Sequence, residues 1–172
     1  MPRIPIKTAA CSSLQIPGVS ARQAKPDDPA LSVMTDFREL NPVTVSESAT
    51  IDDALEHMKH AGVRSAFAIA IQGQLVVGLI TAYDITGEKP MQHMLSVVSS
   101  RPEVLVRDIM QRVDDWQVVD IKDVDRAAVV DVARLFDKTH LTHISVLESA
   151  NDGELRLRGL LSAARVSRLL AK

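Results

Sequence analysis

Two stretches of this 172-residue chain repeat one another. Residues 78–84 read Gly-Leu-Ile-Thr-Ala-Tyr-Asp, and residues 159–165 read Gly-Leu-Leu-Ser-Ala-Ala-Arg. The correspondence extends upstream, where the apolar spacing of residues 51–61 recurs over residues 129–139. The spacing between these two landmarks is slightly longer in the second copy, which indicates a longer hairpin there. A repeat of this length predicts a tandem module whose two units pack on each other.

Each copy contains the same order of expected elements. In the first copy we expect strands at 43–45, 66–71 and 75–80, a helix at 51–61 and a helical segment at 81–98 that Gly87 and Pro90 interrupt. In the second copy we expect strands at 118–121, 143–147 and 155–161, and helices at 129–139 and after Ser162. Thr50 and Asp125 are the expected N-caps of the two central helices. Each unit is therefore strand–helix–strand–strand–helix, with one sheet face left for a partner.

These motifs resemble the cystathionine β-synthase (CBS) domain, and their double occurrence resembles a CBS pair, or Bateman module. The residues that carry the resemblance are Val43 to Val45, Ala54, Met58, Gly62 to Arg64, Ala66 to Ile71 and Gly78 to Asp84, and then Val106 to Met110, Val118 to Ile121, Val132, Phe136, Leu141 to Ile144 and Gly159 to Arg165. The resemblance covers residues 33–172 and implies an α+β fold of two β-α-β-β-α repeats related by a pseudo-two-fold axis.

The sequence departs from the family pattern at a few positions. The family's proline before the buried valine is Phe67 in one copy and Ser145 in the other. The aspartate that ends the last motif is present as Asp84 in the first copy, but Arg165 stands at this place in the second.

Along the chain we expect four segments. Residues 1–30 contain five prolines and no apolar periodicity, which predicts an extended or disordered arm. Residues 31–98 are expected to form the first domain, residues 99–107 a linker, and residues 108–172 the second domain.

Composition excludes several classes of function. The net charge is −2 and both signs are mixed along the chain, which argues against nucleic-acid binding. No apolar run is long enough to span a bilayer. Cys11 is the only cysteine, so no intrachain disulfide can form, and we expect a reducing, cytoplasmic setting.

The resemblance implies that an adenosyl ligand binds between the copies. A carboxylate can accept both ribose hydroxyls, and a hydroxyl at a helix N-terminus suits a phosphate. The expected ligand-binding residues are Asp84 for the ribose, Thr81 for the phosphate, and Ile80, Val43, Thr44, Val45, Arg64, Ser65 and Ala66 around the adenine. Arg64 could also hold a phosphate. Three simpler interpretations stay open: Thr81 as an N-cap only, Asp84 as a partner of the helix dipole, and Arg64 as a solvated side chain.

The corresponding half-site of the second copy contains Ser162, Arg165 and His143. Since an arginine cannot accept hydroxyl donors, this half-site is either empty or rebuilt for anions. The paired histidines His57 and His60, like His140 and His143, lack the third and fourth ligands of a metal site. We expect no metal, no cofactor and no catalytic residue, because no catalytic motif is present.

These features favour a free-standing regulatory module that senses an adenine nucleotide, forms a homodimer and signals to an effector protein that the sequence does not identify. The alternative is a dimerisation or interaction module with a vestigial ligand cleft. A small enzyme is the third interpretation.

Overall fold

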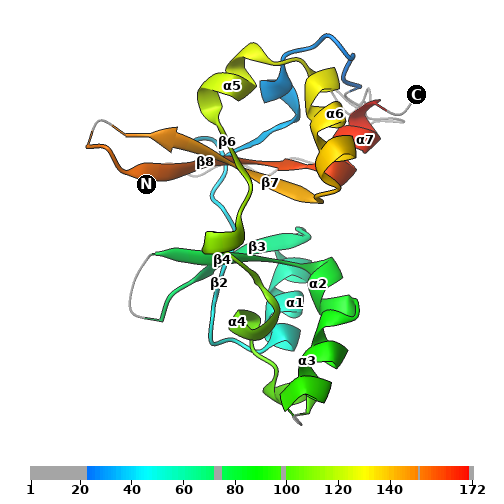
Figure 1. The fold of residues 1–172 in the computed structure, drawn as a ribbon, viewed down its shortest axis with the longest axis vertical. Coiled ribbons are helices and arrows are strands. Elements are labelled where there is room, and N and C mark those ends of the chain that lie inside the picture. Colours follow the sequence, from blue (N-terminus) through cyan, green and yellow to red (C-terminus); the bar gives the residue numbers. More distant parts are fainter. Residues whose placement is uncertain (1–22, 72–74, 98–99, 151, 171–172) are drawn as a thin grey trace, which may run out of the picture.

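The computed structural model describes residues 23–71, 75–97, 100–150 and 152–170. Most of the expected arm at 1–30 and the start of the expected linker at 99–107 lie outside the described residues. Two separate four-stranded sheets form, with strand orders β2-β3-β4-β5 and β6-β7-β8-β1. Figure 1 shows them one above the other, with helices on one side of each sheet. The predicted α+β class is confirmed.

The first repeat follows the predicted order of elements. It contains β2 (Thr44–Ser46), α1 (Ile51–His60), β3 (Ser65–Ile69), β4 (Val76–Thr81), α2 (Ala82–Thr86) and α3 (Lys89–Val97). The hydroxyl of Thr50 accepts the N–H of Asp53 at 3.1 Å, so the predicted N-cap of α1 is confirmed. Ile51, Ala54 and Met58 lie on one face of α1 and are buried, as their three- and four-residue spacing predicts.

The second repeat contains β6 (Val118–Asp120), α5 (Ile121–Arg126), α6 (Val129–Thr139), β7 (His143–Ser149), β8 (Leu155–Ser162) and α7 (Ala163–Leu170). The prediction of Asp125 as an N-cap is wrong, because Asp125 lies inside α5. Asp120 instead caps α5, because its carboxylate accepts the N–H of Lys122 at 2.8 Å. Strand β6 therefore ends at Asp120, one residue before the expected end at Ile121. The start of α6 is held by Asp131, whose carboxylate accepts the N–H of Ala128 at 3.0 Å.

The strand pairing repeats from one sheet to the other. Thr44 lies opposite Phe67 in the parallel pair β2–β3, and Val118 lies opposite Ser145 in the parallel pair β6–β7. Each sheet continues through an antiparallel hairpin, β3–β4 or β7–β8. The identical order and direction of strands relate the repeats by a pseudo-two-fold axis.

The segments that lead into the repeats are exchanged between the two sheets. Strand β1 (Thr35–Asp36), after the 3-10 helix η1 (Ala30–Val33), pairs with β8 of the second repeat. Strand β5 (Gln111–Arg112), after the short helix α4 (Val106–Ile109), pairs with β4 of the first repeat. The 3-10 helices η2 (Arg101–Glu103) and η3 (Val113–Asp115) flank α4 and β5. The division at residues 31–98 and 108–172 stays a prediction about sequence units, and the packing crosses it.

The exchanged lead-in segments contribute buried residues to the two hydrophobic cores. Ala30, Val33 and Met34 are buried among the second-repeat core residues, although they precede the first repeat. Val106 and Ile109 are buried in the same way among the first-repeat core residues. Neither core is complete without the lead-in of the other repeat.

The two repeated glycines have a steric reason. A Cβ on Gly78 would lie 2.5 Å from the Met110 sulfur, and a Cβ on Gly159 would lie 2.7 Å from the Met34 sulfur. Each hypothetical Cβ would also lie 2.8 Å from a carbonyl oxygen of the adjoining lead-in strand. Only glycine lets these strands approach so closely.

Aromatic residues hold the sheets together between the repeats. Phe67 contacts Phe37 and Trp116 in edge-to-face geometry, with ring centroids 5.5 and 6.0 Å apart. Leu79 and Leu160 complete this buried cluster. Phe67, which replaces the family's proline, therefore supplies the centre of the inter-repeat contact. In the part of the chain that the structure describes, no helix has the length and apolar character needed to cross a bilayer.

Candidate functional site

A cavity of about 590 Å³ opens between the two repeats. One wall comes from the first repeat: the lead-in to β2 at Asn41 to Val43 and the turn between α1 and β3 at Ala61 to Ser65. The facing wall comes from the second repeat, where β8 meets α7. Its lining residues there are His143, Leu160, Ser162, Ala164, Arg165 and Arg168, and the crossing lead-in adds Thr35, Phe37 and Leu40.

The cavity brings together residues that the sequence assigned to different half-sites. Val43, Arg64 and Ser65 of the first copy line it together with the second-copy group Ser162, Arg165 and His143. The strand and turn of one repeat thus face the strand–helix junction of the other repeat. This combination follows from the pseudo-two-fold axis, which places the two junctions on opposite sides of the cleft.

Four other predicted residues do not line this cavity. Val45, Ala66 and Ile80 are buried in the first-repeat core, and Thr44 is exposed. The reason is strand alternation: Leu79 and Phe67 point toward the other repeat, so their neighbours Ile80 and Ala66 point toward the helices.

Thr81 and Asp84 do not line the cavity either, and they bond to each other in a capping box. The Asp84 Oδ2 atom accepts the N–H of Thr81 at 2.8 Å and its hydroxyl at 2.7 Å, and the Thr81 hydroxyl accepts the N–H of Asp84 at 3.1 Å. The Asp84 Oδ1 atom lies 2.7 Å from the Lys89 ammonium. Thr81 therefore is the N-cap of α2, and both carboxylate oxygens of Asp84 have partners within the chain.

His143 links the cavity to Asp84. Burial lowers the pKa of His143 below its ordinary value of 6.5, and the negative charge of Asp84 partly offsets this effect. The imidazole is thus held mainly neutral at pH 7. Asp84 lies close enough to act on a residue of the cavity wall, so the two half-sites adjoin across the axis.

The charge of the cavity has a single sign. Arg64, Arg165 and Arg168 line it, whereas none of the lining residues is an aspartate or a glutamate. Within the described ranges, no carboxylate forms an ion pair with these three arginines. The Nε atom of Arg165 is buried and has no hydrogen-bond partner among those residues. A group with several anionic oxygens would satisfy such a wall.

Sequence reasoning missed several members of this wall. Arg168 follows Arg165 at the three-residue spacing that places two side chains on one helix face, so this signal was available. Thr35 and Phe37 carried no comparable signal, because they reach the cleft only through the exchange of the lead-in strand.

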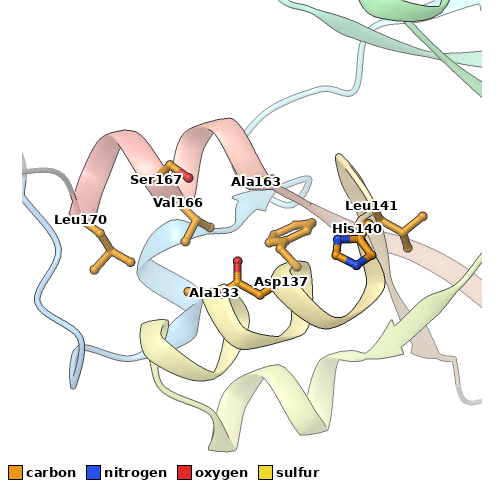
Figure 2. A pocket seen from close by; sticks show the side chains of 9 residues that line it. Ala133, Asp137, His140, Leu141, Ala163, Val166, Ser167 and Leu170 are labelled. Atoms are coloured by element: carbon orange, nitrogen blue, oxygen red, sulfur yellow. The ribbon is translucent and has the colours of Figure 1, made fainter.

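A second hollow of about 350 Å³ lies between α6 and α7 on the outer side of the second repeat. Figure 2 shows its shape, with Leu170 at one end and His140 and Leu141 at the other. Its floor is mostly apolar, with Phe136 and Val166 buried beneath smaller side chains such as Ala133. This groove lacks the cations of the cleft and suits a protein surface better than a charged ligand.

No group of three or more potential ligand side chains that could hold a metal ion occurs in the described part of the chain. The expected absence of a metal stays a prediction. The cleft is the candidate site, and its ionisable lining side chains are three arginines and His143.

Comparison with known proteins identifies the repeat. The family model described as CBS domain matches residues 30–89. No curated protein matches the chain. Among solved structures, CBSX2 in complex with AMP is 26% identical, with a TM-score of 0.55 over 82% of this chain and 94% of that one. A second structure of this CBS-pair protein, CBSX2 from Arabidopsis thaliana, gives 26% identity and a TM-score of 0.52, over 83% and 93% of the two chains.

Two further structures extend the comparison. A hexameric CBS-CP12 protein from bloom-forming cyanobacteria is 26% identical, with a TM-score of 0.54 over 80% of this chain and 65% of that one. An uncharacterised conserved protein from Pyrococcus horikoshii shares the fold at 19% identity, with a TM-score of 0.57 over 86% and 96% of the chains. The sequence match identifies a CBS domain at residues 30–89, and the two symmetric sheets together with these structural likenesses show the architecture of a tandem CBS pair.

Proposed function

We propose that this chain is a regulatory CBS-pair protein that binds an adenosyl nucleotide in the cleft between its repeats and passes the binding event to a partner protein. The observation that carries the proposal is the cleft itself, a cavity of about 590 Å³ lined by three arginines without a carboxylate. This volume falls within the range of ordinary ligand pockets. The AMP complex of CBSX2, a protein of the same architecture, supports the choice of ligand class.

In this proposal the two half-sites serve different parts of one ligand. Asp84 accepts the ribose hydroxyls after releasing Lys89, and the phosphate lies toward the arginine wall, on the far side of His143. The Thr81 hydroxyl donates a hydrogen bond to Asp84 within the capping box. In this proposal Thr81 therefore contacts the ligand through the strand–helix junction that it caps, and not through a free hydroxyl. We propose no catalytic role, which the likeness to CBSX2 and to the CBS-CP12 protein supports.

We also propose that the chain forms a homodimer through its helices, in a reducing, cytoplasmic setting. The groove between α6 and α7 and the exposed side chains of Met91 and Leu95 on α3 support self-association. The hexameric CBS-CP12 protein is an assembled relative. The single cysteine supports the reducing compartment.

A thermal-shift and calorimetry panel of AMP, ADP, ATP, S-adenosylmethionine and NAD tests the nucleotide proposal. We expect at least one adenosyl compound to raise the melting temperature and to bind with measurable heat. Asp84→Ala should weaken binding by about ten- to a hundredfold, because hydrogen bonds to a charged group contribute about 1.5–3 kcal/mol. The wild type should also prefer ribose over 2′-deoxyribose ligands, and this preference should shrink in Asp84→Ala.

The second candidate is an interaction module whose cleft no longer binds a ligand. One observation favours it: both oxygens of Asp84 are already bonded, to Thr81 and to Lys89. If no adenosyl compound binds at millimolar concentration, this second function replaces the first. Equal affinity for ribose and deoxyribose ligands would remove only the assignment of Asp84.

A further inference from the structure

Three arginines line the cleft without a carboxylate partner in the described chain, whereas the other unpaired arginines there, Arg107, Arg112 and Arg126, are exposed and do not line this cavity. Elsewhere Arg38, Arg101, Arg134 and Arg158 each form an ion pair with a carboxylate. Arg64, Arg165 and Arg168, by contrast, line one cavity and form no ion pair with a carboxylate among the residues that the structure describes. Like charges brought together in a partly enclosed cavity repel one another, and the missing countercharge points to an anionic ligand.

The arginines come from both repeats. Arg64 begins the first-repeat wall beside β3, while Arg165 and Arg168 project from one face of α7. Among the residues that the structure describes, the Arg64 guanidinium makes one long hydrogen bond, of 3.4 Å, to the Tyr83 hydroxyl. Arg165 leaves its Nε atom buried without a partner in the described chain. An anion between these side chains would therefore bond to both repeats at once.

We propose that this cleft selects its ligand by the number of phosphates, and that it takes a nucleoside diphosphate or triphosphate in preference to a monophosphate or an uncharged nucleoside. This inference rests on the proposed function and names the ligand class within it. Arg165 is the residue that makes the difference, because it places a cation where a second ribose-binding carboxylate would otherwise lie. The two half-sites then bind one ligand together. The half-site with Asp84 binds the nucleoside, and the half-site with Arg165 binds its phosphates.

Two consequences follow from charge alone. Each added phosphate brings anionic oxygens that can accept from a further guanidinium, so affinity rises from adenosine to AMP to ADP. S-adenosylmethionine carries a positive sulfonium near the ribose, and the arginine wall repels it. Since the contacts are ionic and partly exposed, added salt weakens the binding of the diphosphate more than the binding of adenosine.

Calorimetry without Mg²⁺ tests the proposal with adenosine, AMP, ADP, ATP and S-adenosylmethionine at low and high salt. We expect ADP and ATP to bind about tenfold or more tightly than AMP, as one further hydrogen bond between charged groups provides. In Arg165→Gln this advantage should fall toward unity, and the affinity for adenosine should stay the same. Arg134→Gln is the matched control, because Arg134 lies on α6 in an exposed ion pair with Asp131. It should keep the advantage of ADP.

The outcomes separate this inference from the function on which it rests. If AMP binds as tightly as ADP and ATP, selection by phosphate number is wrong while nucleotide binding stands. Selection by Arg165 is equally wrong if Arg165→Gln retains the full preference. If none of the ligands binds, both proposals fall. Circular dichroism and the melting temperature of Arg165→Gln establish that the variant is folded, so a lost preference reports on the cleft.

Discussion

His140 occupies a backbone conformation that most side chains avoid. It ends α6 in the left-handed region at φ 56°, where the first repeat has Gly62 at φ 67°. A side chain with a Cβ is strained in this region by about 1 kcal/mol, and glycine is not. At this equivalent position the first repeat therefore has an unstrained glycine, and the second repeat has a strained histidine.

We expect His140→Gly to stabilise the second repeat by about 0.5–1 kcal/mol, less than the full strain because glycine also gains freedom in the unfolded chain. Urea denaturation measures the change in the free energy of unfolding. Gly62→Ala is the matched variant at the equivalent position, and it should destabilise by a similar amount. If His140→Gly is destabilising, then contacts of the imidazole outweigh the backbone strain.

Arg158 and Asp36 form an ion pair that binds the crossing lead-in to the second sheet. The two guanidinium nitrogens donate to both carboxylate oxygens, one of them at 2.9 Å, and the Arg158 side chain is only 10% exposed. Hydrogen bonds from Arg158 hold the pKa of Asp36 below its ordinary value of 3.8. The carboxylate is thus favoured in the folded chain, so this stability is present above pH 3.8 and is lost as pH falls through the lowered folded pKa.

Asp36→Asn should accordingly destabilise the protein at pH 7 by about 1.5–3 kcal/mol, since it leaves a nearly buried guanidinium with only the 3.5 Å contact to the Glu148 carboxylate. The loss should narrow as the wild type is titrated below pH 4, where its own pair breaks. Denaturation curves at several pH values measure this. Asp152→Asn, which breaks an exposed pair with Arg156, should change the stability little at any pH. Equal effects of the two variants would contradict the structural role given to Arg158.

At the scale of the elements, the exchanged lead-ins make each repeat depend on residues that precede the other. Val33 is fully buried in the second-repeat core beside Val129 and Phe136, yet it lies before the first repeat in sequence. Removing two buried methyl groups from such a site typically costs about 2 kcal/mol. A substitution that removes part of the Val33 side chain should therefore lower the stability of the second repeat.

We expect Val33→Ala to increase hydrogen exchange in β8 and α6, while β3 and α1 keep their protection. Hydrogen exchange followed by mass spectrometry resolves the two repeats. Val106→Ala is the matched variant, because Val106 is fully buried in the first-repeat core and should produce the opposite pattern. A uniform loss of protection in both variants would mean that the repeats unfold as one cooperative unit.

The repeat and its central helices could be predicted from sequence because their signals are local. The spacing of Ile51, Ala54 and Met58 defines one helix face within ten residues. The pairing of Thr35 with Leu160 has no such local signal, since the two residues are far apart in the chain. The residues of the cleft could be predicted only where a local sequence motif marked them. The charged members Arg64 and Arg165 could be named, but that they line one cavity depends on how the two repeats pack across the pseudo-two-fold axis.

At the scale of the whole molecule, the helices of each repeat cover the face of its sheet that points away from the other repeat (Figure 1). In the first repeat α3 exposes Met91 and Leu95, which are 62% and 73% exposed and lie one helical turn apart. The second repeat has a groove of about 350 Å³ between α6 and α7 instead. A two-fold axis that sets the first repeat of one copy on the second repeat of another would fit each apolar ridge against a groove, twice per dimer.

We therefore expect light scattering to give a dimer of the 18.8 kDa chain at micromolar concentration, in which the first repeat of each copy contacts the second repeat of the other. Leu95→Asp on the ridge and Ser167→Glu in the groove should each shift the mass toward the monomer, because both place a charge in an apolar contact. Leu155→Asp is the control, since Leu155 is 66% exposed at the start of β8 in the β7–β8 hairpin. A wild type that stays monomeric would refute the dimer. A dimer that Leu155→Asp breaks, but the two helix variants leave intact, would place the interface on the hairpins instead.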